Sequence, residues 1–120
     1  MLIALWIINA LLALAFLGAG LMKLARPKAA LAASGMAWTE DFGDGQVKAI
    51  GAVEVLGALG LVLPLLTGVA PVLTPIAAVG LVVTMIVATI VHARRSESVV
   101  PTIVLGVLAL VSAILGFAAL

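Results

Sequence analysis

Residues 47–66 read VKAIGAVEVLGALGLVLPLL, and this stretch decides the fold class. Its length is that of a helix crossing the ~30 Å hydrocarbon core of a bilayer, which takes about 20 residues. Only two of its side chains are charged: Lys48 near the start and Glu54 well inside. A carboxylate at that depth costs about 2.5 kcal/mol or more unless it is paired, hydrated or neutralised. The stretch is therefore a membrane span with one informative polar position.

The rest of the chain has the same character, with 66% hydrophobic and 9% charged residues. Soluble domains average about 25% charged residues, and so short a chain cannot bury this much apolar surface in its own core. Together with 47–66, residues 2–22, 72–92 and 99–120 predict an all-α integral membrane four-helix bundle, one domain over residues 1–120. Because basic residues follow the first span rather than precede it, we interpret that span as a retained helix. The composition excludes a soluble globular domain and a nucleic-acid binder.

The chain has no cysteine, one histidine and no tyrosine. These counts exclude disulfides, thiol redox chemistry, iron–sulfur clusters and a haem held by two histidines of one copy. We expect no metal and no cofactor apart from a bound quinone or lipid.

The basic residues predict the orientation. All six Lys and Arg lie in loop 23–46, at Lys48 or in loop 92–98, whereas loop 67–71 has none. The positive-inside rule then places the two charged loops in the cytoplasm and both termini outside it. In loop 23–46, a short interfacial helix is expected after Pro27, with Trp38 and Phe42 as anchors at headgroup level.

Four polar residues are the candidates for binding a ligand or a proton: Lys23, Glu54, His92 and Arg94. All four fall in the cytoplasmic third of the predicted spans, where they would form a pocket beneath the headgroups. Two interpretations of Glu54 stay open: a structural ion pair or hydrogen bond, for instance with Lys23, or a carboxyl that binds a proton or a ligand. Arg94, with Arg95, also suits a topology determinant that contacts lipid phosphates. For Asn9 we expect an interhelical hydrogen bond.

Three blocks of sequence resemble the DoxX-like family of small four-helix bacterial membrane proteins. They are AFLGAGLMKL at 15–24, KAIGAVEVLGALGLVLPLLTGVAPVLTPIAA at 48–78 and MIVATIVHARRSE at 85–97. Members of this family often close with a basic residue, whereas this chain ends in GFAAL. The family's polar positions correspond here to Lys23, Glu54, His92, Arg94 and Glu97, and no catalytic role comes with them.

The resemblance implies a function in the bacterial inner membrane. The family takes its name from a subunit associated with thiosulfate:quinone oxidoreductase, and some members are placed in membrane-associated oxidoreductase complexes. We therefore expect a multi-pass, non-catalytic subunit that organises a redox-protein partner, contacts membrane lipids and holds a quinone or lipid, in a homo-oligomer or in a complex. Two alternatives are a small oligomeric proton-coupled transporter that uses Glu54 and His92, and an enzyme that uses the same residues as acid and base.

Overall fold

The computed structural model describes residues 2–120, and every regular element in that range is helical. In chain order the elements are α1 (Leu2–Ala25), α2 (Lys28–Ala33), the 3-10 helix η1 (Ala37–Asp41), α3 (Asp44–Thr67), α4 (Leu73–Arg94) and α5 (Val100–Ala118). By length and composition, α1, α3, α4 and α5 are each suited to crossing a membrane. The predicted all-α membrane four-helix bundle is confirmed.

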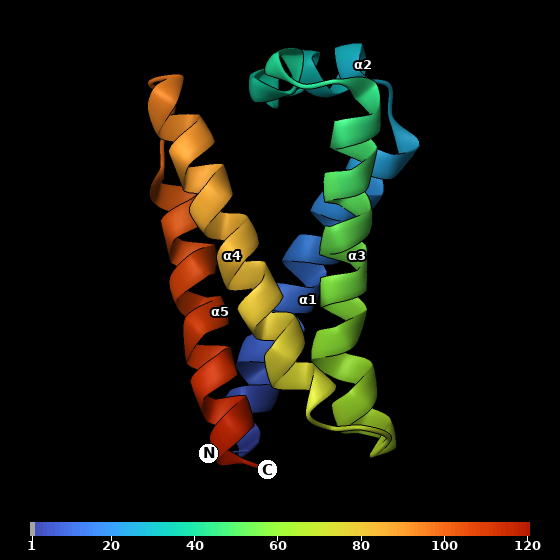
Figure 1. Cartoon of the computed structure of the whole chain (residues 1–120), viewed down its shortest axis with the longest axis vertical. Helices are drawn as coiled ribbons and strands as arrows, with labels where there is room; N and C mark the ends of the chain where they lie inside the picture. Colours follow the sequence, from blue (N-terminus) through green and yellow to red (C-terminus); the bar gives the residue numbers. More distant parts are fainter. Residues whose placement is uncertain (1) are drawn as a thin grey trace.

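The four long helices form two pairs. α1 packs mainly against α3, and α4 packs mainly against α5. Figure 1 shows that the two pairs meet near the end that holds both termini and diverge toward the opposite end. There α2 and η1 lie across the gap, within a segment that we call the cap (residues 26–43).

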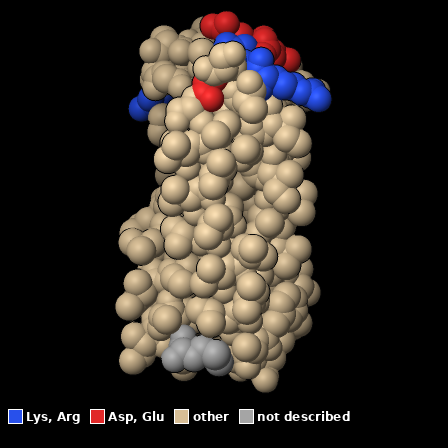
Figure 2. Space-filling view, turned by 90° about the vertical axis from the view of Figure 1, so that its left-hand side faces the viewer, with Lys and Arg blue, Asp and Glu red and all other residues tan. Residues whose placement is uncertain are grey.

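The outside of the bundle is apolar along most of its length. Large hydrophobic side chains point outward from all four long helices, as Leu14 does with 72% of its surface exposed. On the face drawn in Figure 2, the charged side chains of the described residues gather at the capped end. Such a continuous apolar surface is too large for a protein in water and suits contact with lipid.

The ends of α1 and α3 extend beyond the predicted spans because polar groups satisfy their backbones. α1 continues past residue 22 to Ala25, and the Lys48 ammonium donates hydrogen bonds to the carbonyls of Lys23 (2.7 Å) and Arg26 (2.6 Å). Those carbonyls have no partner within the helix, so Lys48 closes its C-terminus. α3 starts at Asp44 rather than residue 47, and the Gln46 side-chain oxygen accepts a hydrogen bond from the backbone of the residue before the helix.

A buried hydrogen-bond network joins three helices in the half of the bundle that holds the termini. The Asn9 amide nitrogen donates to the carbonyl of Leu61 at 2.9 Å, and the Ser112 hydroxyl donates to the Asn9 side-chain oxygen. The interhelical hydrogen bond expected of Asn9 is confirmed. Because it ties α1 to both α3 and α5, it fixes how the two helix pairs meet below the divergent end.

Candidate functional site

A cavity of about 530 Å³ occupies the divergent end of the bundle, beneath the cap. Small-molecule sites in proteins typically have volumes of ~300–1,000 Å³ and mostly apolar walls. The lining residues come from the cap and from all four long helices: Ala19, Lys23, Gly35, Met36, Trp38, Phe42, Ala49, Ile50, Val53, Glu54, Val83, Thr84, Met85, Val87, Ala88, Val91, His92, Thr102 and Leu105.

The cavity is open on the side between α3 and α4. Among its lining residues, Val53 of α3 and Val83 and Val87 of α4 are each about half exposed. The lining residues contributed by α1 and α5 are buried or half-buried. Because the outer faces of α3 and α4 are apolar, this opening would face lipid in a membrane.

A buried ion pair forms one wall of the cavity. The Lys23 ammonium lies 2.5 Å from a carboxylate oxygen of Glu54, and the two side chains are only 7% and 4% exposed. The pairing offsets much of the cost that either charge alone would have inside a membrane span.

The close crossing of α1 and α3 brings these two residues together. A Cβ on Gly20 would stand 2.8 Å from the carbonyl oxygen of Gly51, so only glycine lets the backbones approach this closely. Lys23 and Glu54 each lie one turn beyond the glycine of their own helix. The two glycines therefore determine the position of the ion pair.

Aromatic residues of the cap form the roof of the cavity. Trp38 and Phe42 pack edge to face with ring centroids 5.6 Å apart, and the Lys23 ammonium lies 5.6 Å from the centre of a Trp38 ring. The Lys28 ammonium donates to the carbonyl of Phe42 at 2.8 Å, which holds the end of the cap. The two aromatic residues expected as interfacial anchors line the cavity in the structure.

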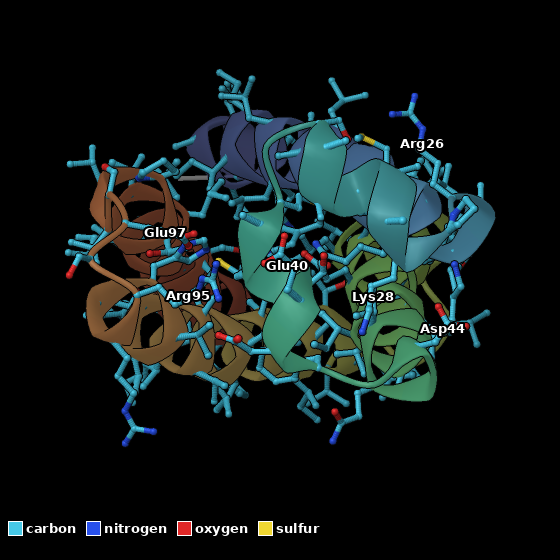
Figure 3. All side chains as sticks on the ribbon, turned by 90° about the horizontal axis from the view of Figure 1, so that it is seen from above. Arg26, Lys28, Glu40, Asp44, Arg95 and Glu97 are labelled. Carbon is cyan, nitrogen blue, oxygen red and sulfur yellow. The ribbon has the colours of Figure 1, made fainter. Side chains whose placement is uncertain are left out.

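A cluster of charged residues joins the cap to the far helix pair. Arg95 donates hydrogen bonds to Asp41 of η1 (2.6 Å) and to Glu97 in the loop before α5 (3.2 Å). We call Asp41, Arg95 and Glu97 the latch. Figure 3 shows Arg95 and Glu97 side by side at the end of α4. Glu97 also lies 2.8 Å from Nδ1 of His92, whose ring is 6.3 Å from that of Trp38.

Comparison with known proteins places this architecture in a family. The sequence profile of the DoxX-like family matches residues 7–115, which include the cap and nearly all of the four long helices. The chain belongs to the DoxX-like family. No curated protein and no solved structure matched the chain.

The structure of this DoxX-like protein brings together three of the four residues proposed from the sequence. Lys23, Glu54 and His92 all line the cavity, whereas Arg94 is exposed and lies outside it. The neighbouring Arg95, not Arg94, makes the contacts to the cap. Their roles in binding stay a prediction. Among the described residues, no group of three or more His, Asp and Glu side chains is arranged to hold a metal ion.

Acid is expected to weaken the latch of the DoxX-like protein, because one of its members is the carboxylate of Glu97. Desolvation acts to raise the pKa of Glu97, but the hydrogen bonds from Arg95 and His92 outweigh it and lower that pKa below its ordinary value of 4.5. A carboxyl with a lowered pKa stabilises the folded state at neutral pH and loses that contribution as the pH falls through its folded-state pKa. The latch is therefore expected to be closed at neutral pH and to weaken as the pH falls through the lowered pKa of Glu97.

The substitution Arg95→Gln tests the latch. Removing the guanidinium breaks the contacts to Asp41 and Glu97, so the cap should open more often. Because ion pairs in contact with water contribute little to stability, we expect amide hydrogen exchange in residues 37–41 to accelerate only about two- to fivefold at pH 7. Arg94→Gln is the matched control, since Arg94 forms no ion pair with any described residue. Equal exchange in the two variants would contradict the role of the latch.

Proposed function

We propose that the protein is a non-catalytic membrane subunit that holds an amphipathic membrane molecule, a quinone or a lipid, for a redox-protein partner in the bacterial inner membrane. The observation that supports this most is the cavity, which is open to the bilayer and has its charged pair and aromatic roof at one end only. A ligand with a polar head and an apolar body matches that distribution.

The order of residues along α4 supports the proposed ligand pose. The cavity begins at His92, near the charged end of the helix, and continues to Val83, nine residues deeper. At 1.5 Å per residue this is a depth of about 14 Å into the span. A polar head beneath the cap would leave an apolar tail among the valines at the opening between α3 and α4.

The residues of the chain give little support for catalysis or electron transfer by this protein without a partner. The sequence contains no cysteine and a single histidine, so one copy has no ligand set for an iron–sulfur cluster or a bis-histidine haem. One carboxylate oxygen of Glu54 is engaged by Lys23, and Nδ1 of His92 is engaged by Glu97, so both candidate acid–base residues already take part in ion pairs. Electron transfer is therefore assigned to the partner protein in this proposal.

Gentle purification into nanodiscs of native lipid tests the proposed function. We expect one quinone or lipid species to be enriched over the bulk membrane, together with a flavin- or haem-containing partner identified by mass spectrometry. A homo-oligomer that carries neither a redox partner nor an enriched amphiphile would contradict the proposal.

The proposed orientation predicts that both termini lie outside the cytoplasm. All Lys and Arg residues belong to the capped end of the bundle, and cytoplasmic loops are rich in such residues. A periplasm-active alkaline phosphatase reporter fused after Leu120 should be active, and a reporter inserted after Ser34 in the cap should be inactive. The reverse pattern would overturn the orientation.

A further inference from the structure

We propose that the cavity selects a neutral ring head group that carries a hydroxyl group, as in the reduced form of a quinone, over an anionic phosphate head group. The proposal rests on the proposed function, since it requires that an amphipathic molecule binds in the cavity. It goes further by naming the chemistry of the head group that the wall beneath the cap recognises.

The ion pair leaves one carboxylate oxygen of Glu54 without a hydrogen-bond partner among the described residues. One carboxylate oxygen of Glu54 accepts from Lys23, while the other accepts no hydrogen bond from any described residue. Among the described residues, only Thr74 has a fully enclosed polar side-chain atom without a partner, so this second oxygen of Glu54 keeps some accessible surface. Glu54 lines the cavity, and a ligand bound there can reach this surface. A ligand hydroxyl at this position would donate a charge-assisted hydrogen bond to Glu54.

Two further polar side chains, Trp38 and His92, line the same cavity. Neither the indole nitrogen of Trp38 nor Nε2 of His92 has a hydrogen-bond partner among the described residues, and neither atom is fully enclosed. Both residues line the cavity, and their rings are 6.3 Å apart. A hydroxyl group of the proposed ring head group can donate a hydrogen bond to Glu54, and an oxygen of the ring can accept one from the indole N–H of Trp38. The polar groups of the ligand would then have both a donor and an acceptor as partners.

The charge of this wall disfavours a phosphate. The Lys23 ammonium is already neutralised by Glu54, so the pair offers no net positive charge to an anion. A phosphate near the open oxygen of Glu54 would meet a like charge in a poorly solvated space, where such repulsion is strong. A fully oxidised quinone has only acceptor oxygens, and its binding would leave the Glu54 oxygen desolvated without a donor.

The shape of the space also matches a ring. Trp38 and Phe42 present aromatic surfaces at the roof, and the walls below them are apolar side chains of α3 and α4. Flat rings stack on such surfaces or meet them edge to face. Two acyl chains with a glycerol backbone would not use these aromatic surfaces.

Fluorescence of Trp38 tests the proposal in the reconstituted protein. A Trp6→Phe background leaves Trp38 as the one tryptophan, and it is titrated with a decyl-chain hydroquinone, the corresponding quinone, the bis-methyl ether of that hydroquinone, and phosphatidylglycerol. We expect the hydroquinone to bind at least about tenfold more tightly than the ether and the quinone, because only it supplies a donor to Glu54. Equal affinities, or tightest binding of phosphatidylglycerol, would overturn the proposal.

The substitution Glu54→Gln gives a second measurement. The amide side chain that it introduces can turn its oxygen to Lys23 and its N–H groups to the cavity, so the preference should shift toward the quinone. Should this variant fail to fold, the comparison among ligands in the Trp6→Phe protein still decides the question.

Filling the cavity by Ala88→Phe tests the proposed function separately from the proposed choice of head group. Loss of binding of all the ligands supports the cavity as the binding site. Undiminished binding contradicts the proposed function itself.

Discussion

Replacing Lys23 with Met is expected to lower the free energy of unfolding by about 3–5 kcal/mol. The change leaves the carboxylate of Glu54 without its partner in a span where its side chain is only 4% exposed. A buried charge that loses its partner costs more than the pair itself contributes, because its desolvation is no longer offset. Equilibrium unfolding in mixtures of dodecylmaltoside and SDS, followed by helical circular dichroism, measures the difference.

The double substitution Lys23→Met with Glu54→Leu is the matched control. It removes both charges and keeps the volume of the side chains similar, so its stability should return to within about 1 kcal/mol of the wild type. A double variant as unstable as Lys23→Met alone would show that packing, rather than the unpaired charge, causes the loss. That outcome would contradict a structural role for the ion pair.

The second large effect is expected from Gly20→Ala, which should destabilise the bundle by about 1–3 kcal/mol. Its Cβ would stand 2.8 Å from the carbonyl oxygen of Gly51 and 2.8 Å from a methyl group of Val55. A backbone oxygen cannot move aside as a flexible side chain can, so α1 and α3 must separate. The separation would also pull Lys23 away from Glu54, and we therefore expect weaker ligand binding as well.

Gly18→Ala is the control for this prediction. It lies on the same helix two residues earlier, and a Cβ there would meet no atom within 4 Å. Because alanine favours the helix by about 1 kcal/mol over glycine, this variant should be as stable as the wild type or slightly more stable. Similar losses in both variants, in the same unfolding assay, would contradict the close crossing of α1 and α3.

Hydropathy and the positions of charges predicted the fold. In lipid, each span must form all of its backbone hydrogen bonds internally, and a helix does so. The same logic singled out Asn9 and Glu54, since a polar group inside a span needs a partner. The residue types of Asn9 and Glu54 predicted that each has a hydrogen-bond or ion-pair partner. In the structure the partners are on neighbouring helices: Ser112 and the Leu61 carbonyl for Asn9, and Lys23 for Glu54.

Features that depend on packing could not be predicted in the same way. Gly20 and Gly80 are the same residue in equally apolar spans, yet Gly20 is buried at the helix crossing and Gly80 is exposed. Arg94 and Arg95 are adjacent and chemically equivalent, and only the end of α4 and the position of η1 decide which of them reaches Asp41. A pocket at the charged end was predicted from Lys23, Glu54, His92 and Arg94, and three of them line the cavity. Its size and its opening follow from the divergence of the two helix pairs (Figure 1), which no local pattern encodes.

The most direct test of the cavity as the binding site compares two substitutions of equal size. Ala88→Phe places a ring in the cavity, and Ala10→Phe places one on the exposed surface of α1, away from the cavity. Each protein is purified in nanodiscs, and the bound amphiphile is extracted and quantified per chain. We predict about one molecule per chain in the wild type and in Ala10→Phe, and a loss of at least about tenfold in Ala88→Phe. Equal amounts in all three proteins would contradict binding in the cavity.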